Sequence, residues 1–90
     1  MPENEQHRTI GKWMYAQRLP QIRGRKTARW EVFNNRGIRL GMIKWENGWR
    51  QYVFWPAPHT LYAASCMEDL AAFVRSVNTA QKAGTLEMLP

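Results

Sequence analysis

Cysteine is almost absent from this 90-residue chain, in which Cys66 is the single example. One cysteine excludes a disulfide within the chain and any zinc site that needs several thiolates. Long apolar runs are missing too: the longest are far shorter than the roughly 20 residues that span a bilayer, and no secretory signal pattern opens the chain. We therefore expect a cytoplasmic protein that has no contact with a membrane.

Acidic residues are missing from a long stretch near the N-terminus. The chain carries 13 Lys and Arg against 7 Asp and Glu, a net charge of +6, yet no carboxylate lies between Gln6 and Trp30. The cations of this stretch are Arg8, Lys12, Arg18, Arg23, Arg25, Lys26 and Arg29. A basic segment of this kind favours an anionic partner, such as nucleic acid or an acidic protein surface. The alternative is a solvated tail that keeps the protein soluble, and charge alone does not decide between the two.

Residues that carry out catalysis or bind metals are also scarce. No acid stands at a spacing that would pair it with His7 or His59, and the chain has neither a phosphate-binding loop nor a cluster of metal ligands. Cys66 falls on the apolar stripe of a predicted helix, where cysteine serves as a small core residue. Glu68 and Asp69 stand at the start of that helix, where they complement its dipole. We expect a protein that is not an enzyme and needs no cofactor.

Tryptophan, by contrast, is abundant, and four of the five lie within residues 30–55. This stretch is typical of three short strands separated by two turns. Asn47-Gly48 predicts a two-residue type I′ hairpin, because both central residues of that turn need a positive φ. Residues 34–37, Asn-Asn-Arg-Gly, predict a longer loop with a bulge.

A two-residue turn sets the pairing of the second hairpin and places Ile43 opposite Tyr52. Side chains alternate across a strand, so every second residue shares a face. One face carries Ile43, Trp45, Tyr52 and Phe54, with Arg50 at its rim. The opposite face carries Met42, Lys44, Glu46, Trp49, Gln51, Val53 and Trp55. The first face is nearly all apolar and is the predicted core face, which Trp30 and Val32 extend.

Gly41 interrupts the pattern of the middle strand. Leu40 and Ile43 are three residues apart, so a regular strand would point them to opposite faces. We expect a bulge at Gly41 that lets both face the core. The small residue also leaves room for Phe54.

The pattern predicts one helix, beginning at Ser65. Ser65 and Glu68 have the spacing of a capping box. Every third or fourth residue is apolar, which makes a stripe that needs a partner, and the aromatic core face is the only one large enough. The stripe consists of Cys66, Leu70, Phe73 and Val77. Past Asn78 the chain becomes polar, with Gly84 a predicted helix breaker.

The flanking segments are less well specified by pattern. The first seven residues are expected to be disordered, and residues 9–15 fit either a strand or a helical turn. Leu19-Pro20 ends that element, residues 21–27 suit an extended linker or an edge, and residues 60–63 suit a short fourth strand. The prediction is an α+β fold: a three- to four-stranded antiparallel sheet with one C-terminal helix on one face. It divides into a basic, partly disordered arm (1–27), the sheet-and-helix domain (28–79) and a flexible tail (80–90).

Residues 29–78 carry a spaced pattern made of Trp30-x-Val32, Leu40-Gly41-x-Ile43-x-Trp45, Trp49-Arg50-x-Tyr52-x-Phe54-x-Pro56 and Cys66-x-x-Asp69-Leu70-x-x-Phe73. This pattern resembles that of a group of small phage and prophage proteins without an assigned activity. The resemblance implies a phage or mobile-element origin, and action in the host-cell cytoplasm. In architecture alone, the arrangement of strands and helix is also similar to the DNA-binding domains of plant ethylene-response factors and the arm-binding domains of phage integrases. Those read DNA with the sheet face opposite the helix.

Two functional hypotheses follow. In the first, the basic arm and the sheet face away from the helix bind nucleic acid or a nucleoprotein complex, because aromatic rings stack on bases and cations contact phosphates. In the second, the chain is an anti-CRISPR-like inhibitor that binds a host defence protein. A homodimer that buries Trp49 and Trp55 is compatible with either. Alternatively, Trp13, Met14 and Tyr15 fold back and cover this face. The candidate binding residues are Arg18, Arg23, Arg25, Lys26, Arg29, Lys44, Trp49, Gln51 and Trp55.

Overall fold

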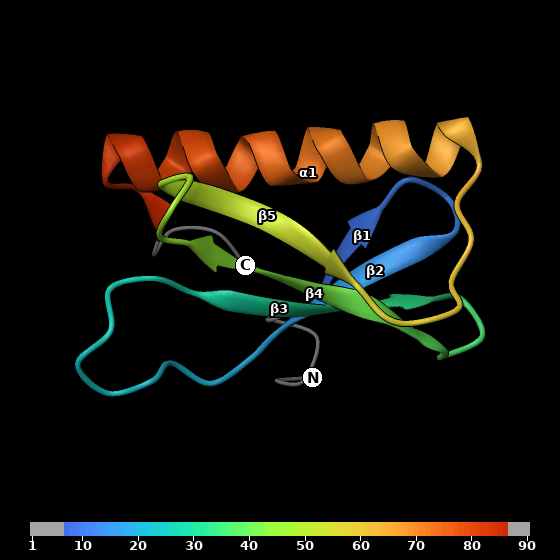
Figure 1. Cartoon of the computed structure of the whole chain (residues 1–90), viewed down its shortest axis with the longest axis horizontal. Helices are drawn as coiled ribbons and strands as arrows, with labels where there is room; N and C mark the ends of the chain where they lie inside the picture. Colours follow the sequence, from blue (N-terminus) through green and yellow to red (C-terminus); the bar gives the residue numbers. More distant parts are fainter. Residues whose placement is uncertain (1–6, 87–90) are drawn as a thin grey trace.

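The computed structural model describes residues 7–86. They form one antiparallel sheet whose strand order follows the sequence, with a long helix across one face (Figure 1). The prediction of an α+β fold with a C-terminal helix on one sheet face is confirmed. The elements are β1 (His7–Ile10), β2 (Met14–Arg18), β3 (Arg29–Asn34), β4 (Arg39–Glu46), β5 (Gln51–Pro56) and α1 (Ala64–Ala83).

The sheet has five strands, where the sequence predicted three or four. The additional strands, β1 and β2, come from residues 7–18, within the stretch assigned to a basic arm. β1 pairs with β2, and β2 pairs with β3, so this segment extends the sheet sideways. Trp13, Met14 and Tyr15 therefore do not fold back over the sheet face that points away from the helix. His7 begins β1, so the disorder predicted for residues 1–7 is wrong at that residue, and the rest of that prediction lies outside the described residues.

The β4–β5 hairpin turns through four residues, 47–50, which corrects the predicted two-residue type I′ turn. The positive φ falls on Arg50 (56°), whose backbone N–H donates to the Glu46 carbonyl at 2.7 Å. Ile43 lies opposite Phe54, two residues beyond its predicted partner. A shift of two residues leaves each side chain of the two strands on its predicted face, because side chains alternate with a period of two. Trp49 and Arg50, which were also assigned to faces, lie in the turn instead.

The bulge predicted at Gly41 is confirmed. Val32 pairs with Gly41, but the next residue along β3 pairs with Arg39, so Leu40 is the extra residue. Leu40 packs against the buried core cluster. A Cβ atom at position 41 would lie 2.8 Å from Phe54 Cζ, well inside van der Waals contact. Glycine is therefore what lets the bulged strand and the ring opposite it share this space.

The core lies between one sheet face and α1. Trp30 and Phe73 meet edge to face across this layer, with ring centroids 5.8 Å apart. The predicted helix stripe is confirmed, since Leu70, Phe73 and Val77 are buried and Cys66 packs half-buried against the same cluster. The fully buried sheet residues include Trp30, Val32, Ile43 and Tyr52. The helix thus covers the face that the sequence assigned to the core.

Both ends of α1 differ from the prediction. The helix begins at Ala64, after an N-cap at Ala63 that makes no side-chain capping hydrogen bond, so the capping box predicted at Ser65 is wrong. It continues to Ala83 and ends at Gly84, which adopts a left-handed conformation (φ 76°) as expected of a breaker. The last turns are not merely a polar tail, because Ala80 and Leu86 are both buried in the core.

Two of the connecting segments, residues 35–38 and 60–63, were also predicted from the sequence. Residues 35–38 form the loop predicted between β3 and β4, with Gly37 at φ 82°. Residues 60–63 form no strand, which corrects that expectation; Leu61 is 95% exposed. Tyr62 instead packs on the core and donates its hydroxyl to the Leu40 carbonyl at 2.8 Å. Within the described chain, no helix combines the length and apolar character needed to cross a bilayer.

Candidate nucleic-acid interface

The outer face is the sheet surface that points away from α1, and within residues 7–86 no helix lies across it (Figure 1). Its side chains alternate along each strand with the buried ones. None of them is fully buried, so the whole surface reaches solvent. By strand register they are His7, Thr9, Tyr15, Gln17, Arg29, Glu31, Phe33, Arg39, Met42, Lys44, Glu46, Gln51, Val53 and Trp55.

Trp55 and Lys44 form the most exposed aromatic site of the outer face. They are diagonal neighbours, because Lys44 pairs with Val53 and Trp55 pairs with Met42. Lys44 Nζ lies 4.5 Å from the centroid of the Trp55 ring, and the tryptophan keeps 41% of its surface exposed. A cation–π pair at an exposed site contributes about 0.5–1 kcal/mol. The pair holds a positive charge beside a solvent-exposed indole.

A second aromatic group crosses β1 to β3 on the same face, and the sequence reasoning missed it. Tyr15 and Phe33 stack with centroids 5.3 Å apart, and His7 meets Tyr15 edge to face at 4.3 Å. Tyr15 pairs with Phe33 on the neighbouring strand, and His7 is diagonal to Tyr15 because it pairs with Gln17. No sequence signal revealed this while residues 9–15 had no assigned structure. Met14 and Ala16 flank Tyr15 and are buried, so an alternating pattern was present, but it was too short to stand out.

The long loop between β2 and β3, residues 19–28, brings cations to one end of the sheet. Leu19 N–H donates to the Arg29 carbonyl at 2.9 Å, and Arg29 Nη2 donates to the Pro20 carbonyl at 3.0 Å. Gln21 Nε2 donates to the carbonyls of Arg25 (2.7 Å) and Thr27 (3.0 Å). These hydrogen bonds tie the loop to the sheet and to itself, so its backbone is held in place.

The cationic hollow lies between this loop and the ends of β3 and β4, and has a volume of about 370 Å³. Among the described residues, no carboxylate lines it, although four cations do. The carboxylates of the neighbouring strands are engaged elsewhere: Glu31 Oε2 pairs with Arg39 Nε at 2.9 Å, and Glu46 Oε2 accepts from Gly48 N–H at 3.1 Å. The hollow is lined by Ile22, Gly24, Arg25, Lys26, Thr27, Arg29, Lys44, Trp45 and Asn47.

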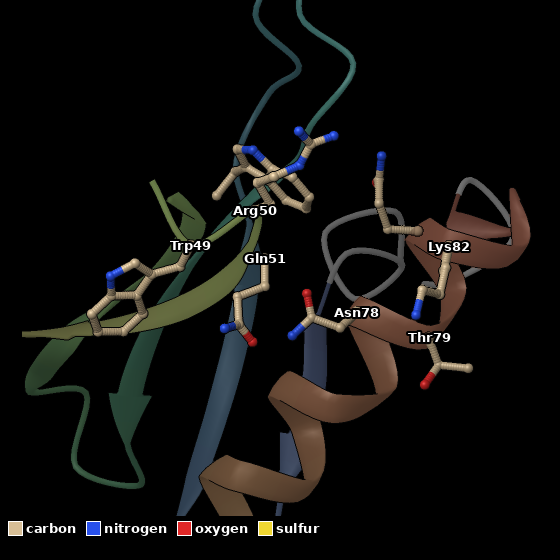
Figure 2. A pocket seen from close by; sticks show the side chains of 8 residues that line it. Trp49, Arg50, Gln51, Asn78, Thr79 and Lys82 are labelled. Carbon is tan, nitrogen blue, oxygen red and sulfur yellow. The ribbon is translucent and has the colours of Figure 1, made fainter. Parts of the chain in front are cut away.

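A second hollow, of about 520 Å³, lies between the β4–β5 loop and the last turns of α1 (Figure 2). Gln51 and Asn78 approach each other across it, whereas the Trp49 ring points away from the helix (Figure 2). Trp49 is 69% exposed. Trp45 lines both hollows, so they are adjacent. The full lining is Trp45, Trp49, Arg50, Gln51, Asn78, Thr79, Gln81 and Lys82.

The structure brings together some of the predicted binding residues and separates others. Around the cationic hollow it gathers Arg25, Lys26, Arg29 and Lys44, with Trp55 beside Lys44. Trp49 and Gln51 line the second hollow instead. Arg23 lies in a turn within the 19–28 loop and is exposed. Arg18 lies on the helix side of the sheet, with its guanidinium 5.6 Å from the centroid of the Trp30 ring.

Arg8 is another cation of the basic stretch that does not lie at the cationic hollow. It lies on the inner side of β1, with its guanidinium carbon 4.7 Å from the Phe73 ring centroid. Partial burial lowers the pKa of the Arg8 guanidinium from its ordinary value. Its Nη1 atom is buried without a hydrogen-bond partner among the described residues. This arginine therefore packs against α1 and does not add to the cations around the hollow.

Within residues 7–86, no three histidine, cysteine or acidic side chains are grouped closely enough to hold a metal ion. The chain matches no model of a known protein family, and no characterised protein or solved structure shows significant similarity to it.

Proposed function

We propose that the protein binds nucleic acid, alone or in a nucleoprotein complex, through the cationic hollow and the outer face, and that it catalyses no reaction. One observation carries this proposal: Arg25, Lys26, Arg29 and Lys44 surround one hollow, and no carboxylate stands in its described lining. The phage or mobile-element origin and the host cytoplasm as the place of action are part of the same proposal.

Like charges gather at the cationic hollow. Four cations around a hollow of this size repel one another, and no carboxylate in its described lining offsets that repulsion. An anionic ligand removes that repulsion and gains the attraction of all four. A phosphate backbone supplies several anions at short spacing, and its release of counterions adds to the affinity.

Charge removal at the hollow tests the proposal. Each lost phosphate contact makes the negative slope of log affinity against log salt shallower, by about 0.7 on a single strand or about 0.9 on a duplex. Lys26→Gln is expected to make the slope shallower by one such step, measured by fluorescence anisotropy with a labelled oligonucleotide. Arg36→Gln is the matched control, because Arg36 is exposed in the loop at the other end of the sheet. Equal slopes for both variants would remove the hollow from the interface.

The alternative function is inhibition of a host defence protein by direct binding. Trp49 favours it: the ring is 69% exposed at a loop tip, next to Arg50. Tryptophan and arginine are the residues that most often dominate protein–protein affinity. A host protein retained on the immobilised chain after nuclease treatment, and lost with Trp49→Ala, would favour this alternative. A homodimer that buries Trp49 and Trp55 is compatible with both functions, and light scattering would detect it.

A further inference from the structure

We infer that the ligand is single-stranded nucleic acid, whose bases lie on the outer face while its phosphates contact the cationic hollow. This inference rests on the proposed function and narrows it to one class of ligand. Three features of the structure carry it: the width of the sheet, the exposure of its aromatic side chains, and the double role of Lys44.

The width of the sheet disfavours a duplex. Strands lie about 4.8 Å apart, so the four spacings from β1 to β5 span about 19 Å. The major groove of B-DNA is about 12 Å wide and the minor groove about 6 Å. A three-stranded sheet, at about 10 Å, fits the major groove face-on, whereas this five-stranded face does not. The two strands that the sequence did not predict therefore change which ligand suits the surface.

The outer face offers aromatic rings for stacking instead. Trp55 is 41% exposed, and the Lys44 ammonium lies 4.5 Å from its ring centroid. Phe33 and Tyr15 form a second platform. β3 and β5 are two strand spacings apart, about 10 Å, so Trp55 and Phe33 serve as separate platforms for different bases. Stacking on aromatic side chains is how sheet surfaces hold unpaired bases.

Lys44 connects the stacking site to the cations. It lines the cationic hollow and also lies against the Trp55 ring. A base stacked on Trp55 would thus have its own phosphate within reach of Lys44. The next phosphates along the strand would lie toward Arg29, Arg25 and Lys26. The stacking site at Trp55 and the cations that would bind phosphate are therefore neighbours on the surface.

The experiment compares ligands of one length at fixed salt. Anisotropy titrations would use labelled 20-nucleotide oligo(dT), 20-nucleotide oligo(rU) and a 20-base-pair duplex. We expect at least tenfold tighter binding to the single strands than to the duplex. The comparison of oligo(dT) with oligo(rU) shows whether the ligand is DNA or RNA. Trp55→Ala should weaken single-strand binding by about 5- to 150-fold. Trp13→Ala is the matched control, since Trp13 is 61% exposed in the β1–β2 turn, away from the cationic loop.

A second measurement does not depend on whether a variant folds. In an NMR titration of the wild-type protein, oligo(dT) should shift the indole N–H signal of Trp55 and leave that of the fully buried Trp30 unchanged. Equal affinity for duplex and single strand, or an unmoved Trp55 signal at saturation, would overturn this inference while leaving nucleic-acid binding in place. Absence of binding to all three oligonucleotides would overturn the proposed function as well.

Discussion

Asn78 on α1 hydrogen bonds both backbone groups of Tyr52 on β5. Its Oδ1 accepts from the Tyr52 N–H at 2.7 Å, and its Nδ2 donates to the Tyr52 carbonyl at 3.3 Å. The side chain thus occupies the place of a neighbouring strand at the free edge of the sheet. The Tyr52 hydroxyl in turn accepts from Ala28 N–H and donates to Gln81 Oε1, both at 3.0 Å. Tyr52 therefore joins α1, the edge strand β5 and the 19–28 loop.

Removing the Asn78 amide tests this link. Asn78→Ala leaves two backbone groups of Tyr52 without their partners, and we expect a loss of about 1–3 kcal/mol in the free energy of unfolding. It also uncovers part of the β5 edge, so self-association should increase. Urea denaturation and light scattering measure the two effects. Thr79→Ala, one residue along on an exposed position, should stay within about 0.5 kcal/mol of wild type.

The Tyr52 hydroxyl also holds the end of the 19–28 loop, because it accepts a hydrogen bond from Ala28 N–H. Tyr52→Phe keeps the buried ring but leaves the Ala28 N–H unpaired, which costs about 1–3 kcal/mol. We also expect faster hydrogen exchange at Ala28 than in wild type, because the loop end is released. Tyr15→Phe serves as the control, since Tyr15 is half-exposed and lies on the outer face. No change in exchange at Ala28 would contradict the assigned role.

Arg50 has a left-handed backbone conformation, with φ at 56°. This conformation is unfavourable for a residue with a Cβ by about 1–2 kcal/mol, and glycine adopts it freely. Arg50→Gly is therefore expected to raise the free energy of unfolding by about 0.5–1 kcal/mol, after the entropy of the unfolded chain is counted. Arg50→Ala removes the same charge and keeps the strain, so it should show no such gain in thermal or urea unfolding.

Gly41 has no room for a methyl group. Gly41→Ala forces a Cβ against the Trp55 backbone carbonyl and the Phe54 ring, and overpacking of this kind costs about 1–3 kcal/mol or more. Gly48→Ala is the comparison, because its Cβ would meet only the end of the Glu46 side chain, at 3.1 Å. Urea denaturation of both variants should show a clear loss at position 41 and a small change at position 48. Similar losses at both positions would count against the packing described at the bulge.

The sheet faces were predictable from sequence although the hairpin pairing was not. Asn47-Gly48 suggested a short turn, but the chain turns through two further residues, with Arg50 taking the positive φ. The shift is even, so the apolar alternation that assigned Ile43 to the core was unaffected. Alternation is a property of each strand alone, whereas the loop length depends on packing between strands.

The remaining errors have local causes. The start of α1 was misplaced because Ser65 has the spacing of a cap, while Tyr62 anchors the preceding connection through its bond to Leu40. The cationic hollow could be predicted only as a list of charges. Its assembly depends on hydrogen bonds between the 19–28 loop and the sheet, which join residues with no shared sequence pattern. The same folding directs Arg8 and Arg18 toward the helix side.

The most direct test of the account is the salt dependence of wild-type binding to 20-nucleotide oligo(dT). Four phosphate contacts, one for each cation of the hollow, predict a slope of log affinity against log potassium chloride of about −2.8, at about −0.7 per contact on a single strand. A slope near this value supports the interface at the cationic hollow. An affinity unchanged from low to moderate salt, or no binding at low salt, would contradict it.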